Sequence, residues 1–431
     1  MNTTTVEGNP MNTLLEELQW RGFIAQHTDL DALDAALEEG PITFYAGYDP
    51  TAASLHHGHL VQLMLMKHLQ NAGHKPLALV GGATGLIGDP RMSGERTLNP
   101  SDVVAEWVEK LRGQISRFLS FEGENAAVMV NNYDWTKDIS AISLMRDLGK
   151  HFRMGTMLAK ESVAARLRSD EGLSFTEFSY QILQANDFAE LYRRYGCTLE
   201  TGGNDQWGNI IGGVDFVRKS LGATVHAFTT PLITKADGTK FGKSEGGAIW
   251  LDPEMLSPYD FFQFWINVDD VEVPKLLKIF TMLPREEIER VIAEHEANPR
   301  ARLGQRTLAR EVTSLVHGAD AAADVEAASG ALFGSGDLAT IDAQTLKDAT
   351  AQLPSANLTL GESTIVDVLV ETGLEKGRSA ARRTVASGGA YLNNVKVEDE
   401  DAVITEADLL PGECVLVRRG RRNLAVARPK A

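Results

Sequence analysis

Cysteine is nearly absent from this sequence. Its 431 residues include two cysteines, Cys197 and Cys414, which are too few to staple so long a chain with disulfides. No ladder of cysteine or histidine pairs at metal-ligand spacing accompanies them. We therefore expect both cysteines to behave as small buried hydrophobic residues, and we expect no metal cage.

Long apolar runs are missing as well. No stretch approaches the roughly 20 apolar residues that a membrane-spanning helix requires. The N-terminal region contains no apolar run of signal-peptide length. These absences argue against a membrane protein and against secretion, and they predict a cytoplasmic location.

Positive charge is scarce overall but is unevenly distributed. The net charge of −17 opposes nucleic-acid binding, because neutralising phosphates requires Lys and Arg. Residues 361–431 nevertheless carry 11 basic and 11 acidic side chains, so the negative excess lies in residues 1–360. Within this last segment, three arginines fall at helical spacing: Arg378, Arg382 and Arg383. On charge alone such a cluster fits a solvated surface as well as an RNA contact.

The region from residue 41 to 233 predicts an α/β fold. Short β-rich apolar runs alternate there with amphipathic segments of helix length, a pattern typical of βαβ units and a parallel sheet. The predicted strands cover residues 42–48, 76–80, 126–130, 197–200 and 227–233. We therefore predict a Rossmann-like domain over residues 1–252, whose ligands bind beyond the carboxyl ends of the strands.

The remaining sequence predicts two further domains. Residues 253–329 are almost wholly helical in pattern, with breaks at Pro274 and Pro284. Residues 330–360 are rich in Gly, Ala, Ser and Asp and are predicted to be a linker. Residues 361–431 fit a small α+β domain. Two or three domains agree with the chain length, because single cores stop growing at about 250–300 residues.

A histidine motif, Leu55-His-His-Gly-His59, follows the first predicted strand. Pro50 forces a turn, and a helix opens near Gly58, so that the histidines lie at its amino end. Helix N-termini favour phosphate groups, and imidazole donors can hold phosphate oxygens whose charge grows as pyrophosphate leaves. The alternative for this segment alone is a pair of surface histidines that cap a helix.

A lysine motif, Lys240-Phe-Gly-Lys-Ser244, follows the last predicted strand. Two lysines around a glycine hinge suit a clamp that closes on polyphosphate in the transition state. A solvated turn is the alternative, and the presence of the histidine motif in the same domain favours the clamp.

A long helix is predicted to begin at a capping box formed by Ser174 and Glu177 and to end at Gly196. Three polar side chains fall at positions i, i+4 and i+7 of this helix: Tyr180, Gln184 and Asp187. Polar stripes usually face solvent, but apolar residues on the same turns indicate a largely buried helix. Buried polar groups need partners, which a ligand can supply.

The two motifs together resemble the signatures of class I aminoacyl-tRNA synthetases, whose usual forms are His-Ile-Gly-His and Lys-Met-Ser-Lys-Ser. The first strand, the glycine-rich runs 81–89 and 202–208 and the polar helix stripe extend this likeness, in order and spacing, to bacterial tyrosyl-tRNA synthetases. The resemblance covers nearly all of the chain. It implies a homodimeric enzyme that activates tyrosine with ATP and Mg²⁺ and then transfers it to tRNA.

The same resemblance implies roles for individual residues. Tyrosine would be bound by Tyr45, Gly47, Asp89, Tyr180, Gln184, Asp187 and Gln206, with Tyr45 and Asp187 at its phenol group. ATP would be bound by Asp49, Gly58, Gly203, Asp205, Lys243 and Arg96. The reacting phosphate would be stabilised by His56, His59, Lys240, Lys243, Ser244 and Thr51. Transfer RNA would contact Arg378, Arg382 and Arg383, in a domain that resembles one of a ribosomal protein, and the helical domain would contact the anticodon arm.

One apolar segment is a candidate dimer face, with a core helix as the alternative: Ile142, Leu144, Met145, Phe152, Met154 and Met157. Three positions depart from the family pattern. The loop after Asp89 is one residue short and lacks the expected lysine, so that either Arg91 or Arg96 serves the leaving phosphates or that contact is missing. Glu200 stands where glutamine is usual, and His57 replaces an apolar residue.

Three rival functions remain at this point. Tryptophan activation uses the same fold, but Asp187 opposite Tyr45 suits a phenol better than an indole. A carboxylate-activating nucleotidyltransferase without RNA can use the same histidine motif, and the C-terminal domain argues against it. A non-catalytic RNA-binding paralogue is disfavoured by the intact histidine and lysine motifs.

Overall fold

The computed structural model describes residues 13–90, 94, 97–170, 172–239, 241–242, 247–333, 336–420 and 423–430. The chain forms two compact units, each of which combines two segments. The first unit comprises Met1–Met255 and Asp269–Gly304, and the second comprises Leu256–Val268 and Gln305–Ala431.

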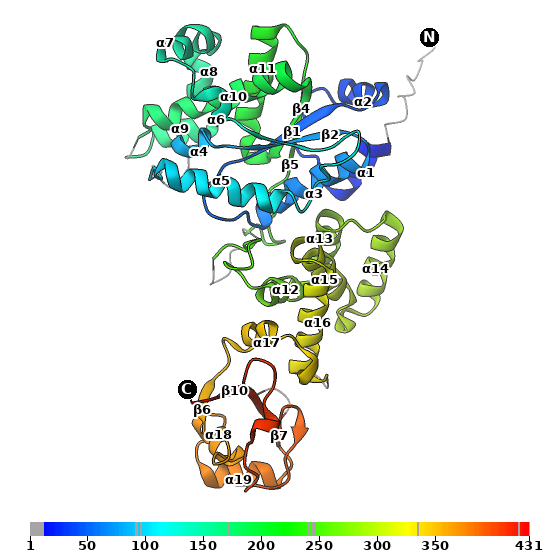
Figure 1. Ribbon diagram of the computed structural model, residues 1–431. Helices are drawn as coiled ribbons and strands as arrows, with labels where there is room; N and C mark the ends of the chain where they lie inside the picture. Colours follow the sequence, from blue (N-terminus) through cyan, green and yellow to red (C-terminus); the bar gives the residue numbers. More distant parts are fainter. Residues whose placement is uncertain are drawn as a thin grey trace. The chain divides into compact units, whose positions relative to one another are not determined.

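A parallel sheet forms the centre of the first unit (Figure 1). Its described strands are β1 (Thr43–Tyr48), β2 (Lys75–Val80), β3 (Val128–Asn131), β4 (Cys197–Gly203) and β5 (His226–Thr230). They lie in the order β3-β2-β1-β4-β5, and every neighbouring pair is parallel. This confirms the predicted Rossmann-like sheet. The order reverses between β1 and β4, which is where ligands of such sheets bind.

Helices cover both faces of this sheet. The helices of the first unit are α1 (Thr13–Arg21), α2 (Leu30–Glu39), α3 (His57–Asn71), α4 (Thr84–Ile87), α5 (Ser101–Ile115), α6 (Tyr133–Thr136), α7 (Ala141–Ser143), α8 (Met154–Leu158), α9 (Glu161–Leu167), α10 (Phe175–Tyr195), α11 (Trp207–Leu221), α13 (Val273–Phe280) and α14 (Arg285–Ala297). Helices α10 and α11 lie on one face, and α3 and α5 lie on the other (Figure 1). Phe188 of α10 and Phe216 of α11 join Tyr45 and Leu77 of the sheet in one core.

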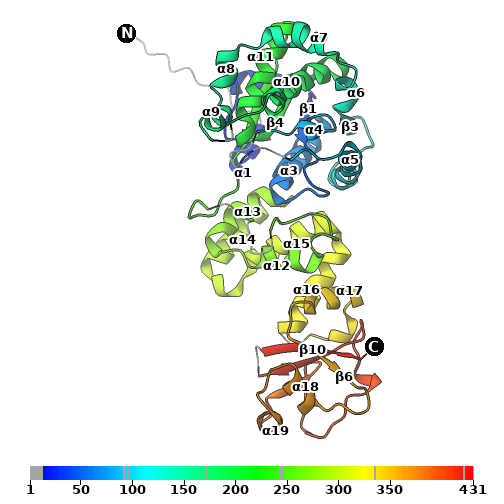
Figure 2. The same ribbon diagram turned by 90° about the vertical axis from the view of Figure 1, so that its left-hand side faces the viewer.

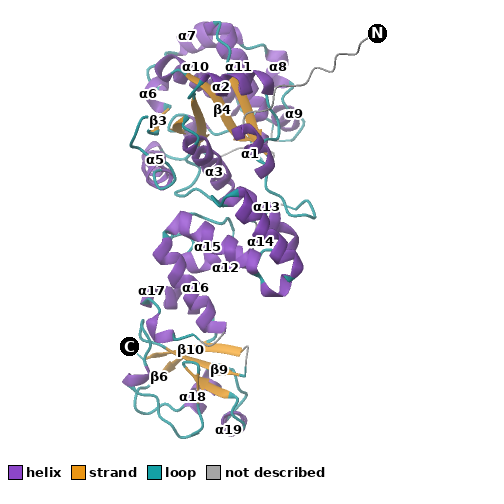
Figure 3. Cartoon of the chain, turned by 90° about the vertical axis from the view of Figure 1, so that its right-hand side faces the viewer, coloured by secondary structure: helices purple, strands orange, loops and turns teal. Residues whose placement is uncertain are grey.

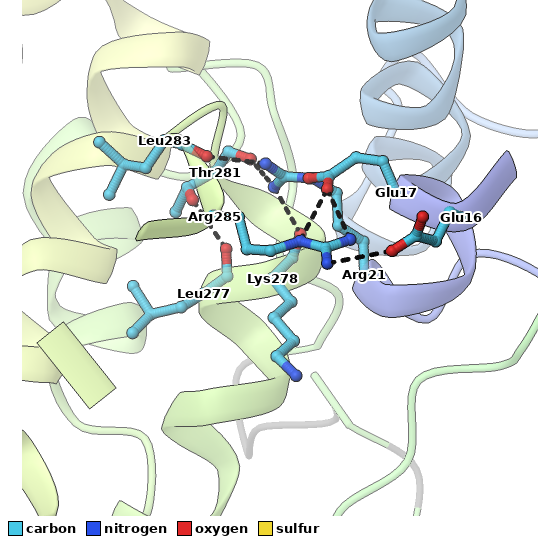
Figure 4. A network of polar contacts seen from close by, with 8 residues as sticks. All are labelled: Glu16, Glu17, Arg21, Leu277, Lys278, Thr281, Leu283 and Arg285. Atoms are coloured by element: carbon cyan, nitrogen blue, oxygen red, sulfur yellow. Dashed lines mark hydrogen bonds and ion pairs between the residues drawn. The ribbon is translucent and has the colours of Figure 1, made fainter. Parts of the chain in front are cut away.

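A polar network fastens α13 to α1 (Figure 4). The buried guanidinium of Arg21 donates to three carbonyls at the end of α13 and just beyond it: Lys278 (3.0 Å), Thr281 (3.0 Å) and Leu283 (2.7 Å). Glu17 accepts from Arg21 at 2.7 Å and also pairs with Arg285 at 3.0 Å. Because the last carbonyls of a helix have no intrahelical donor, Arg21 supplies what α13 lacks.

Helix α13 and the short turn before it in turn hold the segment that follows β5. The Ala236 N–H donates to the buried carboxylate of Glu272, and the Lys275 ammonium donates to the Thr234 carbonyl at 3.1 Å. The backbone just before the lysine motif is therefore attached to α13.

The second unit combines helices with a mixed sheet (Figure 2). Its helices are α12 (Pro258–Ile266), α15 (Leu303–His317), α16 (Ala319–Phe333), α17 (Ala343–Thr350), α18 (Ile365–Glu371) and α19 (Arg378–Ala386). Its strands are β6 (Ser355–Leu358), β7 (Ala390–Leu392), β8 (Val395–Lys396), β9 (Val415–Arg419) and β10 (Asn423–Pro429), in the order β6-β10-β9-β7-β8. Figure 3 shows β6, β9 and β10 of this sheet together with α18. Leu369, Val385, Val417 and Ala425 belong to the apolar core between this sheet and its helices.

The organisation of the chain differs from the sequence prediction in two respects. Residues 330–360 are not a structureless linker, because they contain α17 and β6, and β6 is an edge strand of the second sheet. Their small-residue composition hides the buried face that Leu346 and Thr350 give to α17. The helical pattern of residues 253–329 is confirmed, but its helices are divided between the two units. Within the part of the chain that the structure describes, no helix has the length and apolar character needed to cross a membrane.

Candidate active site

A cavity of about 420 Å³ opens where β1 and β4 end. All of the described candidate residues of the tyrosine and ATP sites line it: Tyr45, Gly47, Asp49, Thr51, His56, Gly58, His59, Asp89, Tyr180, Gln184, Asp187, Gly203, Asp205 and Gln206. Five further candidates lie outside the described residues: Arg91, Arg96, Lys240, Lys243 and Ser244. The sequence motifs therefore converge on one place, the reversal point of the parallel sheet.

The wall of the cavity includes a buried hydroxyl, that of Tyr45, and a buried carboxylate, that of Asp187. The Tyr45 hydroxyl has no hydrogen-bond partner among the described residues, although the side chain is buried. Burial, followed by the neighbouring Glu200, raises the pKa of Tyr45, so that the hydroxyl keeps its proton at neutral pH. A buried polar group without a partner costs free energy, so this hydroxyl is well suited to meet a polar atom of a ligand.

The carboxylate of Asp187 is held by two donors. Asn132 Nδ2 donates to it at 3.0 Å and Trp135 Nε1 at 2.8 Å. Burial raises the pKa of Asp187 to about 7, and these two hydrogen bonds oppose that rise by stabilising the charged form. The sequence reasoning missed Asn132 and Trp135, although Asn132 follows the carboxyl end of β3, where site residues of parallel sheets gather.

The three polar residues predicted to form a stripe on α10, Tyr180, Gln184 and Asp187, all line the cavity. The capping box is only half formed. Ser174 accepts from the Glu177 N–H at 3.3 Å, but the Glu177 carboxylate forms a buried bidentate pair with Arg166, at 3.2 and 3.0 Å. The prediction that Glu177 closes the box is therefore wrong, because an arginine from α9 offers its carboxylate a stronger partner.

The carboxylate of Asp49 orients Tyr180 within this stripe. It accepts from the Tyr180 hydroxyl at 2.7 Å and from Thr84 Oγ1 at 2.6 Å. A Cβ atom at Gly81 would lie 1.9 Å from Asp49 Oδ1, so only glycine permits this close approach.

A second polar cluster surrounds Asp89. Its carboxylate accepts from Gln206 Nε2 and from Asn209 Nδ2, each at 3.1 Å. Lys160 Nζ donates to Asn209 Oδ1 at 3.3 Å, and burial lowers the pKa of Lys160 to about 8 although Asp89 and Glu200 oppose the change. Neither Lys160 nor Asn209 was predicted. Lys160 lies between the short helices α8 and α9, where no local pattern marks a site residue, and Asn209 lies in the first turn of α11, just after the glycine-rich run 202–208.

The histidine motif caps α3 through its own side chains. His56 Nδ1 accepts from the Gly58 N–H at 3.0 Å, and His59 Nδ1 accepts from the His56 N–H at 3.2 Å. The two rings stack with their centroids 4.0 Å apart. Burial lowers the pKa of both histidines, most strongly that of His59, so both rings are neutral at neutral pH. Since each Nδ1 is an acceptor, each Nε2 carries the proton and is a donor.

His57 brings the lysine motif against the histidine motif. Its Nε2 lies 3.0 Å from the Phe241 carbonyl oxygen, and its backbone N–H donates to the Ile249 carbonyl at 2.9 Å. Gly242, with φ of +77°, sits so close that a Cβ there would lie 2.1 Å from the His57 ring. Burial lowers the pKa of His57 to about 4. The described part of the lysine motif thus adjoins the cavity where the histidines lie.

The arginine cluster belongs to the second unit. Arg378, Arg382 and Arg383 are all exposed on α19. Arg378 pairs with Asp367 at 2.8 Å and Arg382 with Glu400 at 3.7 Å. Acidic neighbours therefore accompany two of these three arginines.

The candidate dimer face is mixed in character. Ile142, Met145 and Met154 are 66%, 61% and 58% exposed, whereas Met157 is buried. The segment therefore contributes both to the core and to an apolar surface.

Comparisons with known proteins agree with this geometry. Residues 37–334 match the family described as tRNA synthetases class I (W and Y), and the chain belongs to that family. Residues 345–427 match the tyrosine–tRNA ligase SYY-like C-terminal domain.

The relatives are similar over almost their whole length. The chain is 59% identical over 416 residues to the tyrosine–tRNA ligase of Streptomyces coelicolor, covering 96% of this chain and 98% of the relative. It is 56% identical over 422 residues to that of Bifidobacterium longum, covering 96% of each. A crystal structure of a C-terminally truncated mitochondrial tyrosyl-tRNA synthetase of Aspergillus nidulans aligns with a TM-score of 0.68 at 31% identity, covering 76% of this chain and 95% of that chain.

Proposed function

We propose that this chain activates L-tyrosine with ATP and transfers it to the 3′ end of tRNA(Tyr). The activity is that of a tyrosine–tRNA ligase of class I, as the family membership and the near-full-length likeness to such ligases indicate. Within a family that also includes tryptophan enzymes, the observation that favours tyrosine is the buried Tyr45 hydroxyl in the same cavity as the Asp187 carboxylate.

Recognition of the phenol follows from these two groups. The carboxylate of Asp187 accepts from the phenol O–H, and the Tyr45 hydroxyl donates to the phenol oxygen. Phenylalanine would leave both protein groups unpaired, and this class of enzyme is known to reject it by about 10⁵-fold. Asp89, Tyr180 and Gln184 face the ammonium group, and Gly47 and Gln206 complete the proposed tyrosine site.

The activation step needs no protein nucleophile. The tyrosine carboxylate, ionised at neutral pH, forms a bond to the α-phosphorus of ATP while the bond from that phosphorus to pyrophosphate breaks. In the proposed arrangement, Asp49, Gly58, Gly203, Asp205 and Arg96 contact ATP, which arrives with Mg²⁺ as its companion ion. A hydroxyl of the terminal ribose of tRNA then attacks the carbonyl carbon of the adenylate and releases AMP.

Catalysis in this scheme comes from positioning and from stabilising charge. The Nε2–H groups of the neutral His56 and His59 donate to phosphate oxygens as negative charge accumulates on the leaving pyrophosphate. Thr51, Lys240, Lys243 and Ser244 are the remaining groups that we assign to this task. Donors that are already oriented by the helix cap need no reorganisation during the reaction.

The rest of the proposal concerns tRNA, assembly and location. We assign residues 1–252 to catalysis, residues 253–329 to the anticodon arm and residues 361–431 to RNA binding through Arg378, Arg382 and Arg383. We propose a cytoplasmic homodimer whose interface includes the exposed Ile142, Met145 and Met154. Light scattering of the purified chain tests the dimer, and a monomer at micromolar concentration contradicts it.

ATP–pyrophosphate exchange with each amino acid tests the activity. We expect exchange with tyrosine, none with tryptophan and almost none with phenylalanine, followed by charging of tRNA(Tyr). Exchange with tryptophan, or with no amino acid, would refute the proposal.

A further inference from the structure

Glu200 is a buried carboxyl group in the wall of the active-site cavity. It belongs to β4, is 3% exposed and lines the cavity. In the parallel register of β1 and β4 it stands directly beside Tyr45. The residue next to Tyr45 on the neighbouring strand is therefore an acid.

The surroundings of Glu200 offer few hydrogen bonds to a negative charge. From α10, Gln184 Nε2 donates to Oε1 at 3.4 Å, which is a long contact. From α11, the backbone of Gly213 closes over the other oxygen, since a Cβ there would lie 3.2 Å from Oε2. From β5, the register partner is Ala227, which brings no charge.

Four titratable side chains face Glu200: Tyr45 from β1, Asp187 from α10, Lys160 from the connection between α8 and α9, and Cys197 from β4 itself. Burial raises the pKa of Glu200 to about 8, and Asp187 adds to the rise. Tyr45, Gln184 and Lys160 oppose it, but do not offset the burial.

The two buried carboxyl groups of the cavity are therefore unequal. Asp187 receives two direct hydrogen bonds, at 3.0 and 2.8 Å, which stabilise a carboxylate. Glu200 receives one amide contact at 3.4 Å. A proton available to the pair is more stable on Glu200, because hydrogen bonds to the charged form favour ionisation of Asp187.

We propose that Glu200 is a positioning residue that works as a neutral acid and leaves the Tyr45 hydroxyl proton available to the phenol of bound tyrosine. This rests on the function proposed above. A neutral carboxyl has nearly the shape of a glutamine side chain and attracts the Tyr45 proton less strongly than a carboxylate does. Once ionised, Glu200 becomes an acceptor beside Tyr45, attracts that proton and deprives the phenol oxygen of its donor.

The variant Glu200→Gln tests the proposal, because it keeps the shape but cannot ionise. KM for tyrosine and kcat are measured by ATP–pyrophosphate exchange between pH 6.5 and pH 9.5 for both proteins. At pH 6.5 we expect the two KM values to agree within about twofold. By pH 9.5 we expect the wild-type KM to exceed that of the variant by about tenfold, the value of one hydrogen bond.

The comparison isolates Glu200. The amine of free tyrosine, Asp187 and Lys160 titrate in both proteins, so their contributions cancel in the ratio of the two KM values. We expect the ratio of kcat values to stay constant with pH, because Glu200 does not touch the reacting atoms. A merely structural role would change the melting temperature without making the KM profiles diverge.

Two results would overturn the proposal. Parallel KM profiles would mean that the charge on Glu200 has no effect on tyrosine, and a tenfold higher KM for the variant at pH 6.5 would mean that a carboxylate is required. If the variant does not fold, infrared difference spectra of the wild type between pH 7.5 and pH 9.5 decide instead. With glutamate labelled by ¹³C at its side-chain carboxyl, which separates the glutamate bands from that of Asp187, we expect a protonated glutamate band to disappear over that range, and its absence at pH 7.5 would contradict a neutral Glu200. Absence of tyrosine-dependent exchange in the wild type at every pH would reject the proposed function itself.

Discussion

The two sheets of this protein use their interiors in different ways. The parallel sheet of the first unit buries polar groups around a cavity, among them Tyr45, Asp187 and Glu200. The core of the second sheet is apolar and includes Leu369 and Val417, with the arginines of α19 exposed on the outside.

The two units therefore differ in how stability and function are related. In the first unit, the groups that recognise a ligand are the groups whose burial costs free energy, so function and stability draw on the same residues. In the second unit, an apolar core stabilises the fold while charged side chains remain at the surface. Mutations should therefore affect the two units differently.

The largest effect is expected from the buried ion pair between Arg166 and Glu177. Arg166→Ala leaves a buried carboxylate without its partner and should lower the free energy of unfolding by about 3–5 kcal/mol. Urea denaturation, followed through the loss of exchange activity, measures this change in the free energy of unfolding. Arg218→Ala is the matched control, because Arg218 is 68% exposed and its pair with Asp215 should contribute less than about 1 kcal/mol. Equal losses in the two variants would contradict the comparison.

A cavity in the second core should destabilise without affecting chemistry. Leu369→Ala removes a fully buried side chain and should cost about 2–5 kcal/mol of unfolding free energy. The kinetics of pyrophosphate exchange should not change, because the active-site cavity belongs to the first unit. The exposed Val395→Ala is the control, with a change within about 0.5 kcal/mol. A changed KM for tyrosine in Leu369→Ala would show that the units are not independent.

Removing the buried hydroxyl of Tyr45 should change the kinetics without lowering the stability. Tyr45→Phe should raise KM for tyrosine about tenfold and reduce the preference for tyrosine over phenylalanine by about 10- to 100-fold. Its unfolding free energy should stay the same or rise, because a buried unsatisfied group is lost. Exchange kinetics with both amino acids provide the measurement, and Tyr192→Phe on α10 is the control. A preference equal to that of the wild type would argue that the phenol binds elsewhere.

The smallest effect is expected at the surface of the second unit. Arg382→Ala should weaken tRNA binding about three- to tenfold and lower the salt dependence by about one phosphate contact. Exchange kinetics should not change. Filter binding at several salt concentrations measures the slope, with the exposed Arg218→Ala of α11 as control. Identical slopes for Arg382→Ala and the wild type would exclude a phosphate contact.

Much of the fold and site could be predicted because the signals are local. The strands of the parallel sheet are short apolar runs, and the histidine motif lies where a strand turns into a helix. Strand β5 ends at Thr230 rather than at the predicted residue 233, because Pro231 cannot donate to the sheet.

The missed features depend on contacts between distant segments. Asn132 and Trp135 reach Asp187 from 55 and 52 residues away. Glu177 is drawn from its helix cap by an arginine 11 residues earlier in the chain. Lys160 has no periodic pattern around it. Such partners become visible only when the chain is folded, because tertiary packing decides which of several possible hydrogen bonds is formed.

The hydrogen bonds of Arg21 connect helix α1, through α13, to the backbone that precedes the lysine motif. If α1 were removed, the carbonyls of Lys278 and Thr281 would lose their guanidinium donor, and α13 would be less firmly seated. Because Glu272 and Lys275 hydrogen-bond to the backbone that precedes the lysine motif, that backbone would then be held less firmly as well. Helix α1 therefore helps to hold in place a loop more than two hundred residues away in the sequence.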